Sequence, residues 1–254
     1  GVHRIASRID GRFELVAGAL SSSADTAAES AADLGIAPDR SYSDFRVMAK
    51  TEADRSDGID AVAIVTPNQM HAAPVIAFLR AGISVICDKP LCATLAEADE
   101  IAAAIKSSNA HFVLTHNYTG YPLVRHARRI IANGELGAIR VAQIEYAQDW
   151  LAKSIENEGQ KQAAWRTDPA KSGGGGAIGD IGTHAFNLLG FVTGLKTEAL
   201  SADLHSFGTG RQVDDNAHIL LRMQGGAKAM LWASQIAIGN ENRMCLRVYG
   251  EKGG

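Results

Sequence analysis

The stretch DAVAIVTPNQMHAAPVIAFLRAGISVICDKP, residues 60–90, decides the fold class of this chain. It opens with a continuous apolar run at residues 60–66, which is typical of a parallel strand that is buried on both faces. An apolar helix is expected over residues 69–82, and a second strand over residues 83–88. A strand, a helix and a strand in this order predict a right-handed βαβ unit.

The same alternation continues on both sides of this unit. Before it lie a short apolar strand at 13–20 and an Ala-rich helix at 23–35. After it, Thr94 and Glu97 form a capping box that begins the next helix, and a further strand is expected at 111–117. We therefore expect an α/β Rossmann-type fold with an open, doubly wound parallel sheet.

The N-terminal residues 1–10, GVHRIASRID, have the character of the end of a first helix. In a doubly wound sheet the strand before that helix lies at the centre, beside the point where ligands bind. We therefore expect the native protein to continue before residue 1, with its first strand outside this chain. The chain stops at YGEKGG directly after a predicted strand, so we expect its C-terminal sheet to be incomplete as well.

The pattern changes near the middle of the chain. A helix at 123–134 leads into a long strand at 138–150, a polar stretch follows, and an apolar helix ends near Thr193. Only strands are expected after that helix, at 199–207, 215–223, 227–238 and 243–249. A Gln-Gly-Gly turn at 224–226 joins two of them as a hairpin, and such short turns indicate a large, mainly antiparallel sheet.

The length of 254 residues is enough for two domains. We expect an α/β domain at residues 1–120 and an α+β domain at residues 121–254. The composition, 46% hydrophobic and 21% charged, is that of an ordinary globular protein. A formal net charge of −3 gives no electrostatic reason to expect nucleic acid or an anionic membrane surface as a partner.

Three scattered cysteines, Cys87, Cys92 and Cys245, are too few for a disulfide framework. They indicate reduced thiols and a cytoplasmic protein. No apolar stretch approaches the roughly 20 residues that cross a bilayer. The histidines and cysteines show no HxxxH or CxxC spacing, so we expect no metal site.

The run GGGGAIGDIGTH, residues 173–184, matches the letters of a G-x-G-x-x-G phosphate loop. Such a loop must follow a buried strand, and the preceding AAWRTDPAKS cannot form one. A flexible surface loop is the second interpretation. In the third, Asp180, His184 and Asn187 share one face of a helix, and the carboxylate orients the imidazole as a general base. The glycines would then let the backbone approach a substrate or cofactor.

Three consecutive strands deliver polar residues to one edge of the predicted sheet. Lys89 follows one of these strands, and Pro90 after it can introduce a cis peptide bond. A lysine there can stabilise the alkoxide that develops as a hydride leaves, although an ordinary surface lysine is the alternative. Asn68 and His71 follow the neighbouring strand, and THNYTGYP at 115–122 ends the third. Open α/β sheets bind ligands at this edge.

Two segments resemble a known family. VTPNQMHAAPVIAFLRAGISVICDKPLCATLAEA and the later GGGGAIGDIGTHAFNLLGFVTG resemble the Gfo/Idh/MocA oxidoreductases, the group of glucose–fructose oxidoreductase and inositol dehydrogenase. This resemblance runs from end to end of the chain. It implies a Rossmann domain that binds NAD or NADP, followed by a domain whose large sheet carries the substrate site and often the interface of a homo-oligomer.

The family's catalytic lysine, aspartate and histidine correspond to Lys89, Asp180 and His184. The implied reaction is reversible hydride transfer between nicotinamide and a hydroxyl-bearing carbon of a sugar, inositol or related polyol. In it, His184 would move the hydroxyl proton, Lys89 would polarise the oxygen, and Asp180 would orient His184 or bind a neighbouring hydroxyl. A regulatory protein that senses dinucleotide or sugar without turnover is the alternative. Such a protein would tolerate loss of the lysine or histidine, and the presence of both here favours the enzyme.

The resemblance also implies two sets of binding residues. The cofactor set is Ser21, Ser22, Thr66, Pro67, Asn68, His71, Asp88, Lys89, Pro90 and Asn117. The substrate set is Lys89, Asn117, Tyr118, Trp165, Arg166, Asp180 and His184. The family's N-terminal phosphate loop is absent from this sequence, so we expect residues 1–254 alone to bind a nicotinamide cofactor weakly or not at all. The serines after the strand at 13–20 leave the choice between NAD and NADP open.

Overall fold

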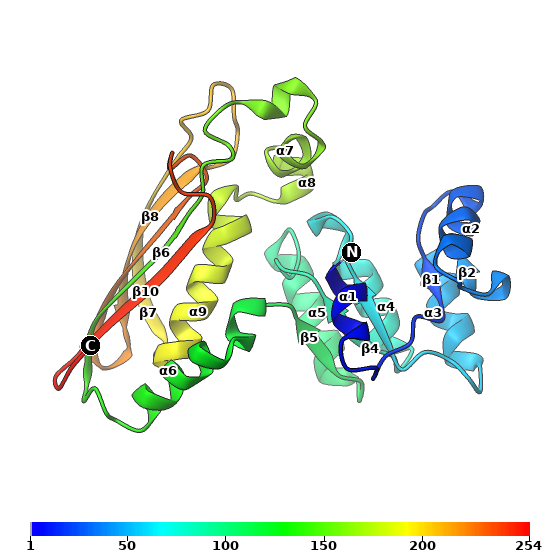
Figure 1. Ribbon diagram of the computed structural model, residues 1–254, viewed down its shortest axis with the longest axis horizontal. Helices are drawn as coiled ribbons and strands as arrows, with labels where there is room; N and C mark the ends of the chain where they lie inside the picture. The colour runs from blue at the N-terminus through cyan, green and yellow to red at the C-terminus, as the bar shows by residue number, and fades with distance from the viewer. Residues whose placement is uncertain (1) are drawn as a thin grey trace. The chain divides into compact units, whose positions relative to one another are not determined.

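The computed structural model describes residues 2–254. The chain divides into two compact units, the first ending at Thr115 and the second beginning at His116 (Figure 1). Among residues 2–254, none of the helices has the length and apolar character that a bilayer-spanning segment needs.

The first unit alternates strands and helices as the sequence predicts. Its helices are α1 (Val2–Arg8), α2 (Ala24–Asp33), α3 (Phe45–Asp54), α4 (Ala72–Arg80) and α5 (Leu95–Ser107). Its strands are β1 (Gly18–Ala19), β2 (Ser41–Tyr42), β3 (Ala61–Ile64), β4 (Ser84–Cys87) and β5 (Phe112–Leu114). All strand pairs are parallel, in a two-stranded sheet β1-β2 and a three-stranded sheet β3-β4-β5.

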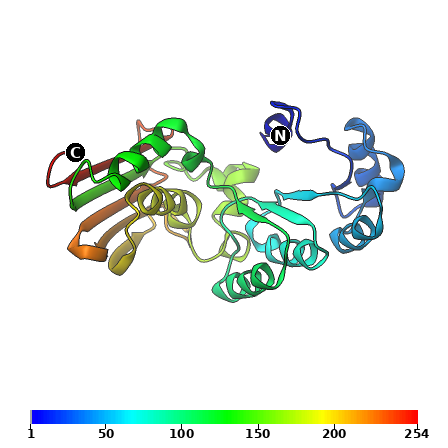
Figure 2. The ribbon, with the colours of Figure 1, turned by 90° about the horizontal axis from the view of Figure 1, so that it is seen from below.

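The predicted βαβ unit of this first part is confirmed. Helix α4 joins β3 to β4, and Val75, Phe78 and Leu79 on α4 are buried in one core with Val85 of β4. Figure 2 shows α4 and α5 along the same side of the β3-β4-β5 sheet. Burying side chains of this size contributes about 1.5–3 kcal/mol each. The capping box that begins α5 is also present.

Two expectations for the first unit are wrong. The apolar run at 13–20 forms a strand only at Gly18–Ala19. The run at 60–66 is not buried on both faces, because Ala63 is exposed and 59% of Val65 is accessible. Both differences have the same physical reason: β1 and β3 lie in separate sheets, and β3 is an edge strand without a second neighbour among residues 2–254.

The second unit pairs helices with one five-stranded sheet. Its helices are α6 (Pro122–Ala132), α7 (Lys161–Arg166), α8 (Pro169–Ser172) and α9 (Thr183–Thr193), with a π-helical turn at Ile178–Gly182 directly before α9. Its strands are β6 (Ile139–Ala147), β7 (Thr197–His205), β8 (Asn216–Met223), β9 (Lys228–Ser234) and β10 (Arg243–Gly250). The strand order is β10-β6-β9-β8-β7.

This sheet is mainly antiparallel, as predicted, with one parallel pair, β6 and β9. The predicted Gln-Gly-Gly turn joins β8 to β9 as a hairpin. The polar stretch before the glycine run contains the short helices α7 and α8.

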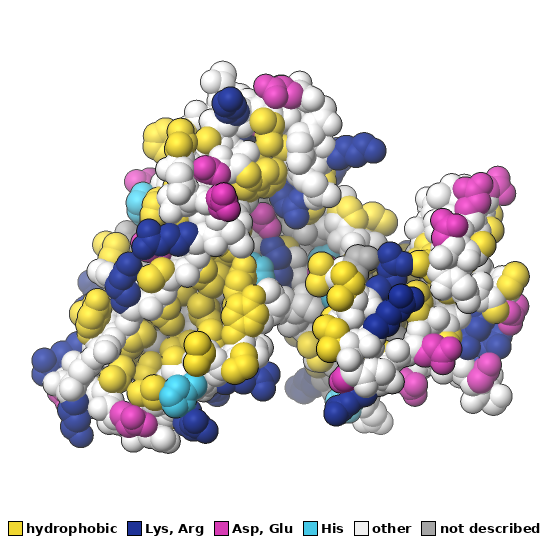
Figure 3. Space-filling model, viewed as in Figure 1, with side chains coloured by type: hydrophobic (Ala, Val, Ile, Leu, Met, Phe, Trp, Pro, Cys, Tyr) yellow, Lys and Arg dark blue, Asp and Glu magenta, His cyan; other side chains and the backbone are white. Residues whose placement is uncertain are grey.

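Helices α6 and α9 lie along the sheet of the second unit (Figure 1). Leu188, Leu189 and Val192 of α9 are buried against Ile144 of β6 and Leu231 of β9. Hydrophobic side chains gather on this side of the unit, over α9 and β10 (Figure 3). This core fixes the position of α9, and with it the position of the candidate site at its N-terminal end.

Candidate functional site

Two loops at the carboxyl ends of β3 and β4 are joined through His71. Only 1% of His71 is exposed. Its Nδ1 lies 2.8 Å from the carbonyl oxygen of Pro90, and its Nε2 lies 2.8 Å from the carbonyl oxygen of Thr66. Both ring nitrogens therefore face backbone, and this predicted cofactor residue acts on the site by holding the two loops together. Pro67 is exposed and Asn68 is buried in the first of these loops.

The loop after β4 is fixed by a second set of contacts. The Lys89–Pro90 peptide bond is cis, a geometry that a proline at position 90 permits. The Asp88 carboxylate accepts hydrogen bonds at 2.8 Å from His3 of α1 and at 2.9 Å from Thr115 after β5. Lys89 is half-buried between these anchored neighbours. The position of its backbone is thus determined by groups from three other parts of the first unit.

The serines after β1 form the start of α2. The Ser21 hydroxyl accepts a hydrogen bond from the Ser23 N–H at 3.1 Å, and Ser23 caps the helix. Ser22 is exposed. Asp25 lies in the first turn of α2, where its charge is favourable.

In the second unit, His184 lies among aromatic rings. It belongs to the first turn of α9 and is 8% exposed. Tyr118 meets it edge to face, with ring centroids 5.0 Å apart, and His116 lies 5.7 Å away in a similar arrangement. Asn117, between these two residues, is exposed. The imidazole is thus buried in a wall of aromatic rings, which limits its contact with water.

A chain of hydroxyl groups begins beside this histidine. The Tyr118 and Tyr146 hydroxyl oxygens are 2.6 Å apart, and Tyr146 donates to Asn242 Oδ1 at 2.8 Å. Because Tyr146 has one hydroxyl proton, which Asn242 accepts, Tyr118 must donate to Tyr146. Burial, and to a lesser extent the nearby Asp180 charge, hold the pKa of Tyr146 well above its usual value, so it remains a neutral phenol.

Gln235 and Arg166 both reach the Asp180 carboxylate. Gln235 donates to Asp180 Oδ2 from its Nε2 at 2.9 Å, and Arg166 Nε lies 3.4 Å from the same oxygen. The Arg166 guanidinium stacks on Trp165 at 4.4 Å and also bonds Gln162. Of the predicted Trp165–Arg166 pair, the structure brings Arg166 to Asp180, and Trp165 contacts Arg166.

The local conformation at Asp180 differs from the prediction. Asp180 lies in the π-helical turn Ile178–Gly182 and not in the first turn of a regular α-helix with His184. A π turn holds an additional residue, so the simple i, i+4 relation between the two side chains does not apply.

The close approach expected of the glycines occurs at Gly176, but its partner is protein backbone. A Cβ atom at Gly176 would lie 2.0 Å from the carbonyl oxygen of Asp214. The Asp214 carboxylate accepts the N–H of Gly176 at 2.7 Å and that of Ile178 at 2.8 Å. Burial outweighs these bonds and raises the pKa of Asp214. At Gly174 and Gly179 a Cβ would meet nothing within 4 Å.

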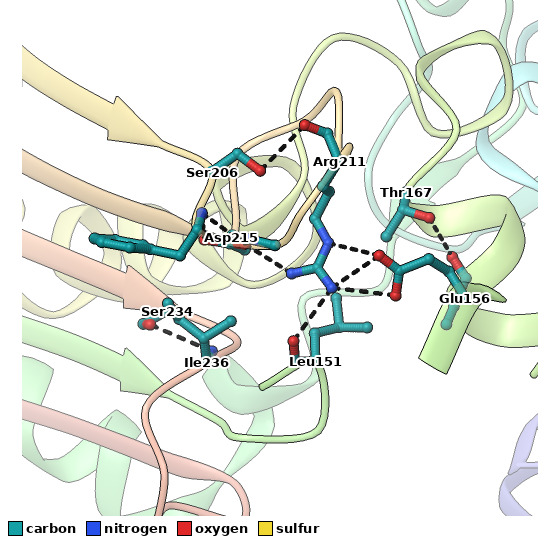
Figure 4. Close-up of polar contacts among 11 residues, drawn as sticks. Leu151, Glu156, Thr167, Ser206, Arg211, Asp215, Ser234 and Ile236 are labelled. Carbon is teal, nitrogen blue, oxygen red and sulfur yellow. Dashed lines mark hydrogen bonds and ion pairs between the residues drawn. The ribbon is translucent and has the colours of Figure 1, made fainter. Parts of the chain in front are cut away.

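A buried charged cluster lies beside this contact (Figure 4). The side chains of Arg211 and Asp215 are fully buried, with Arg211 Nη1 2.7 Å from Asp215 Oδ2. Arg211 also donates to Glu156 and to the carbonyl oxygen of Leu151. Six polar residues that make the contacts of the second unit were not among the predicted site residues: Tyr146, Arg211, Asp214, Asp215, Gln235 and Asn242. The adjacent aspartates before a predicted strand were the available signal, since acidic residues are rarely buried without a role.

The cysteines among residues 2–254 form no disulfide. Cys87, Cys92 and Cys245 are free thiols. Burial raises the pKa of the Cys87 thiol to about 12, so it stays protonated. Within residues 2–254, no three or more His, Cys, Asp or Glu side chains are grouped as a metal site requires.

Comparisons with known proteins cover almost the whole chain. The family described as an oxidoreductase family with an NAD-binding Rossmann fold matches residues 2–116, and the GFO/IDH/MocA C-terminal domain matches residues 124–254. The crystal structure of an oxidoreductase from Sinorhizobium meliloti is 54% identical, with a TM-score of 0.87, over 98% of this chain and 66% of that one.

Two further relatives carry ligands or a named activity. An inositol dehydrogenase homologue from Azotobacter vinelandii, in complex with NADH and myo-inositol, is 34% identical with a TM-score of 0.88 over 98% of this chain and 64% of that one. Levoglucosan dehydrogenase from Pseudarthrobacter phenanthrenivorans is 30% identical over 90% of this chain and 61% of its own length.

The chain spans between 61% and 64% of the length of the first two curated relatives it matches, one of which is an uncharacterized oxidoreductase of Bacillus subtilis at 35% identity over 98% of this chain. A Rossmann-type parallel sheet, a mainly antiparallel second sheet and matches in both halves agree on one assignment. The chain belongs to the GFO/IDH/MocA family of oxidoreductases.

Proposed function

We propose that this protein is a nicotinamide-dependent dehydrogenase that acts on a hydroxyl-bearing carbon of a sugar, inositol or related polyol. The observation that carries the proposal is the wall around His184, where a buried imidazole is flanked by Tyr118 and Tyr146 and follows the anchored Asp180 by four residues. Hydroxyl, carboxylate and imidazole groups together suit a polyhydroxy substrate and its proton. Relatives described with myo-inositol and with levoglucosan support the same class of substrate.

The first unit fits one part of a dinucleotide. Polar groups follow the carboxyl ends of β3 and β4, which is where open parallel sheets bind nucleotides. His71 fixes the two loops that carry them, and Asp88 is anchored from both sides. These contacts hold in place the backbone that carries Thr66, Asn68 and Lys89. When bound there, NAD supplies the hydride acceptor at its nicotinamide ring.

Each proposed catalytic residue then has one task. His184 accepts the hydroxyl proton at an imidazole nitrogen, and its surroundings restrict competing water. Lys89 of the first unit is assigned the stabilisation of the negative charge that develops on the reacting oxygen, which an ammonium group provides by a hydrogen bond. Tyr118 already donates its proton to Tyr146, so its oxygen accepts a bond from a neighbouring substrate hydroxyl.

The test is a panel of polyols and sugars with NAD and NADP, run on the natural full-length protein. His184→Gln and Lys89→Met should each lower kcat by about 10²–10⁴-fold, since each removes a group that acts on the transferred proton or the oxygen. Matched controls are His111→Gln and Lys228→Met, both at exposed positions. A His184→Gln variant whose kcat stays within twofold of its control would refute the assigned role. Binding of cofactor and polyol without turnover by the wild type would favour the sensing alternative.

We also propose that the protein forms a homo-oligomer through the outer face of its five-stranded sheet. Leu220 and Met230 are paired across β8 and β9, and Val141 and Tyr249 are paired across β6 and β10. All four side chains are exposed, with 64% of Leu220 accessible. Apolar side chains grouped on one face commonly mark an interface. Leu220→Glu should lower the mass measured by light scattering, and an unchanged mass would contradict the proposal.

A further inference from the structure

Gln235 holds the Asp180 carboxylate from the side of the sheet. It follows β9 directly, and 2% of it is exposed. Its Nε2 lies 2.9 Å from Asp180 Oδ2. The second partner of that oxygen, Arg166, is more distant and lies on the short helix α7. A hydrogen bond from a neutral amide is directional and fixes the orientation of a carboxylate. An arginine on a partly exposed helix attracts the carboxylate mainly by its charge.

The backbone of Gln235 is held on both sides. Its N–H donates to the carbonyl oxygen of Asp215 at 2.9 Å, and its carbonyl oxygen accepts the N–H of Leu151 at 2.9 Å. Both of these neighbours are bonded to Arg211, which reaches the Asp215 carboxylate at 2.7 Å and the Leu151 carbonyl at 3.2 Å. Gln235 therefore bonds two backbone segments, at Asp215 and at Leu151. Figure 4 shows the Arg211 guanidinium that contacts both of these segments.

The same short segment of chain also holds the other side of Asp180. Asp214, next to Asp215, accepts two backbone N–H groups at the start of the π-helical turn. Adjacent residues thus fix the backbone that carries Asp180 and, through Gln235, the carboxylate itself. Groups that act as a unit in this way hold a side chain far more tightly than one hydrogen bond does.

We propose that Gln235 is a positioning residue for Asp180, and that the buried Arg211–Asp215 pair fixes it in that role. The inference rests on the proposed dehydrogenase activity. It predicts that the direction of the Asp180 carboxylate, and with it kcat, depends on a hydrogen-bond donor at position 235.

The test compares Gln235→Glu with Gln224→Glu, the same substitution in the exposed turn between β8 and β9. A carboxyl group at position 235 donates to Asp180 only while the pair retains one proton, and repels it once both are ionised. The kcat of Gln235→Glu relative to wild type should therefore fall about tenfold or more between pH 6 and pH 9. The ratio for Gln224→Glu should stay constant. A flat ratio for Gln235→Glu would overturn the inference.

Gln235→Leu keeps the test available if the added charge prevents folding. It removes the donor without adding a charge, and we expect kcat to fall about 10–100-fold at an unchanged KM for NAD, because small displacements of an orienting group are costly. A kcat within twofold of wild type would overturn the inference. An inactive wild type would refute the proposed function, whereas an active wild type with unaffected Gln235 variants would refute only the role of Gln235.

Discussion

Gly176→Ala should destabilise the second unit, and the structure sets the size of the effect. The new Cβ would lie 2.0 Å from the Asp214 carbonyl oxygen, where ordinary contact begins at 3.4 Å. The backbone must therefore move by about 1.4 Å, which breaks the bond from Gly176 N–H to the Asp214 carboxylate and that from Ala177 N–H to the Asp214 carbonyl. A charged and a neutral hydrogen bond contribute about 2–3 and about 1 kcal/mol, so the loss is about 3–4 kcal/mol.

Thermal unfolding followed by tryptophan fluorescence measures this loss directly. All three tryptophans, Trp150, Trp165 and Trp232, belong to the second unit, so the signal reports on that unit. The expected decrease in Tm is about 6–16 °C for a unit of this size. Gly174→Ala is the matched control, because its Cβ meets nothing within 4 Å, and its Tm should change little. Equal Tm values for the two variants would refute the packing argument.

Two further predictions concern buried polar groups. Burial raises the pKa of Asp214 in the folded state, so the stability that this residue contributes is complete below its unfolded pKa and declines as pH rises through its folded pKa. Urea unfolding of wild type and Asp214→Asn from pH 4 to pH 7 should therefore show the stability advantage of wild type shrinking. A constant or growing advantage would contradict this prediction. His71→Leu leaves the Thr66 and Pro90 carbonyls without their imidazole partner and should lower the free energy of unfolding of the first unit by about 1–3 kcal/mol, measured by circular dichroism in urea. The exposed His111→Leu is its control, and equal losses would count against the loop-joining role.

The features that local sequence determines could be predicted. The alternation around α4, the capping box of α5 and the hairpin between β8 and β9 each follow from residues close together in the chain. The strand predicted at 13–20 failed because a strand needs a hydrogen-bonding neighbour, and β1 has only the two residues of β2 beside it in the described chain.

The candidate site could be predicted only in part, for the same reason. Asp180 and His184 stand out because they follow a glycine run. Gln235 is 55 residues from Asp180, and Asp214 is 38 residues from Gly176, so no local spacing connects either pair. Their contacts depend on how the sheet brings the ends of β8 and β9 to the start of α9.

The π-helical turn before α9 has a consequence for how this wall can change in evolution. Successive residues of an α-helix are rotated by about 100°, and a π turn contains one residue more than the α-helical turn it replaces. Deleting Gly179 would therefore rotate everything before the turn by about that angle relative to His184 and Leu188 on α9. The rotation between the two sides of the turn is set in steps of a single residue. One insertion or deletion therefore exchanges which side chains before the turn lie on the same side as His184, while the core beneath α9 stays unchanged.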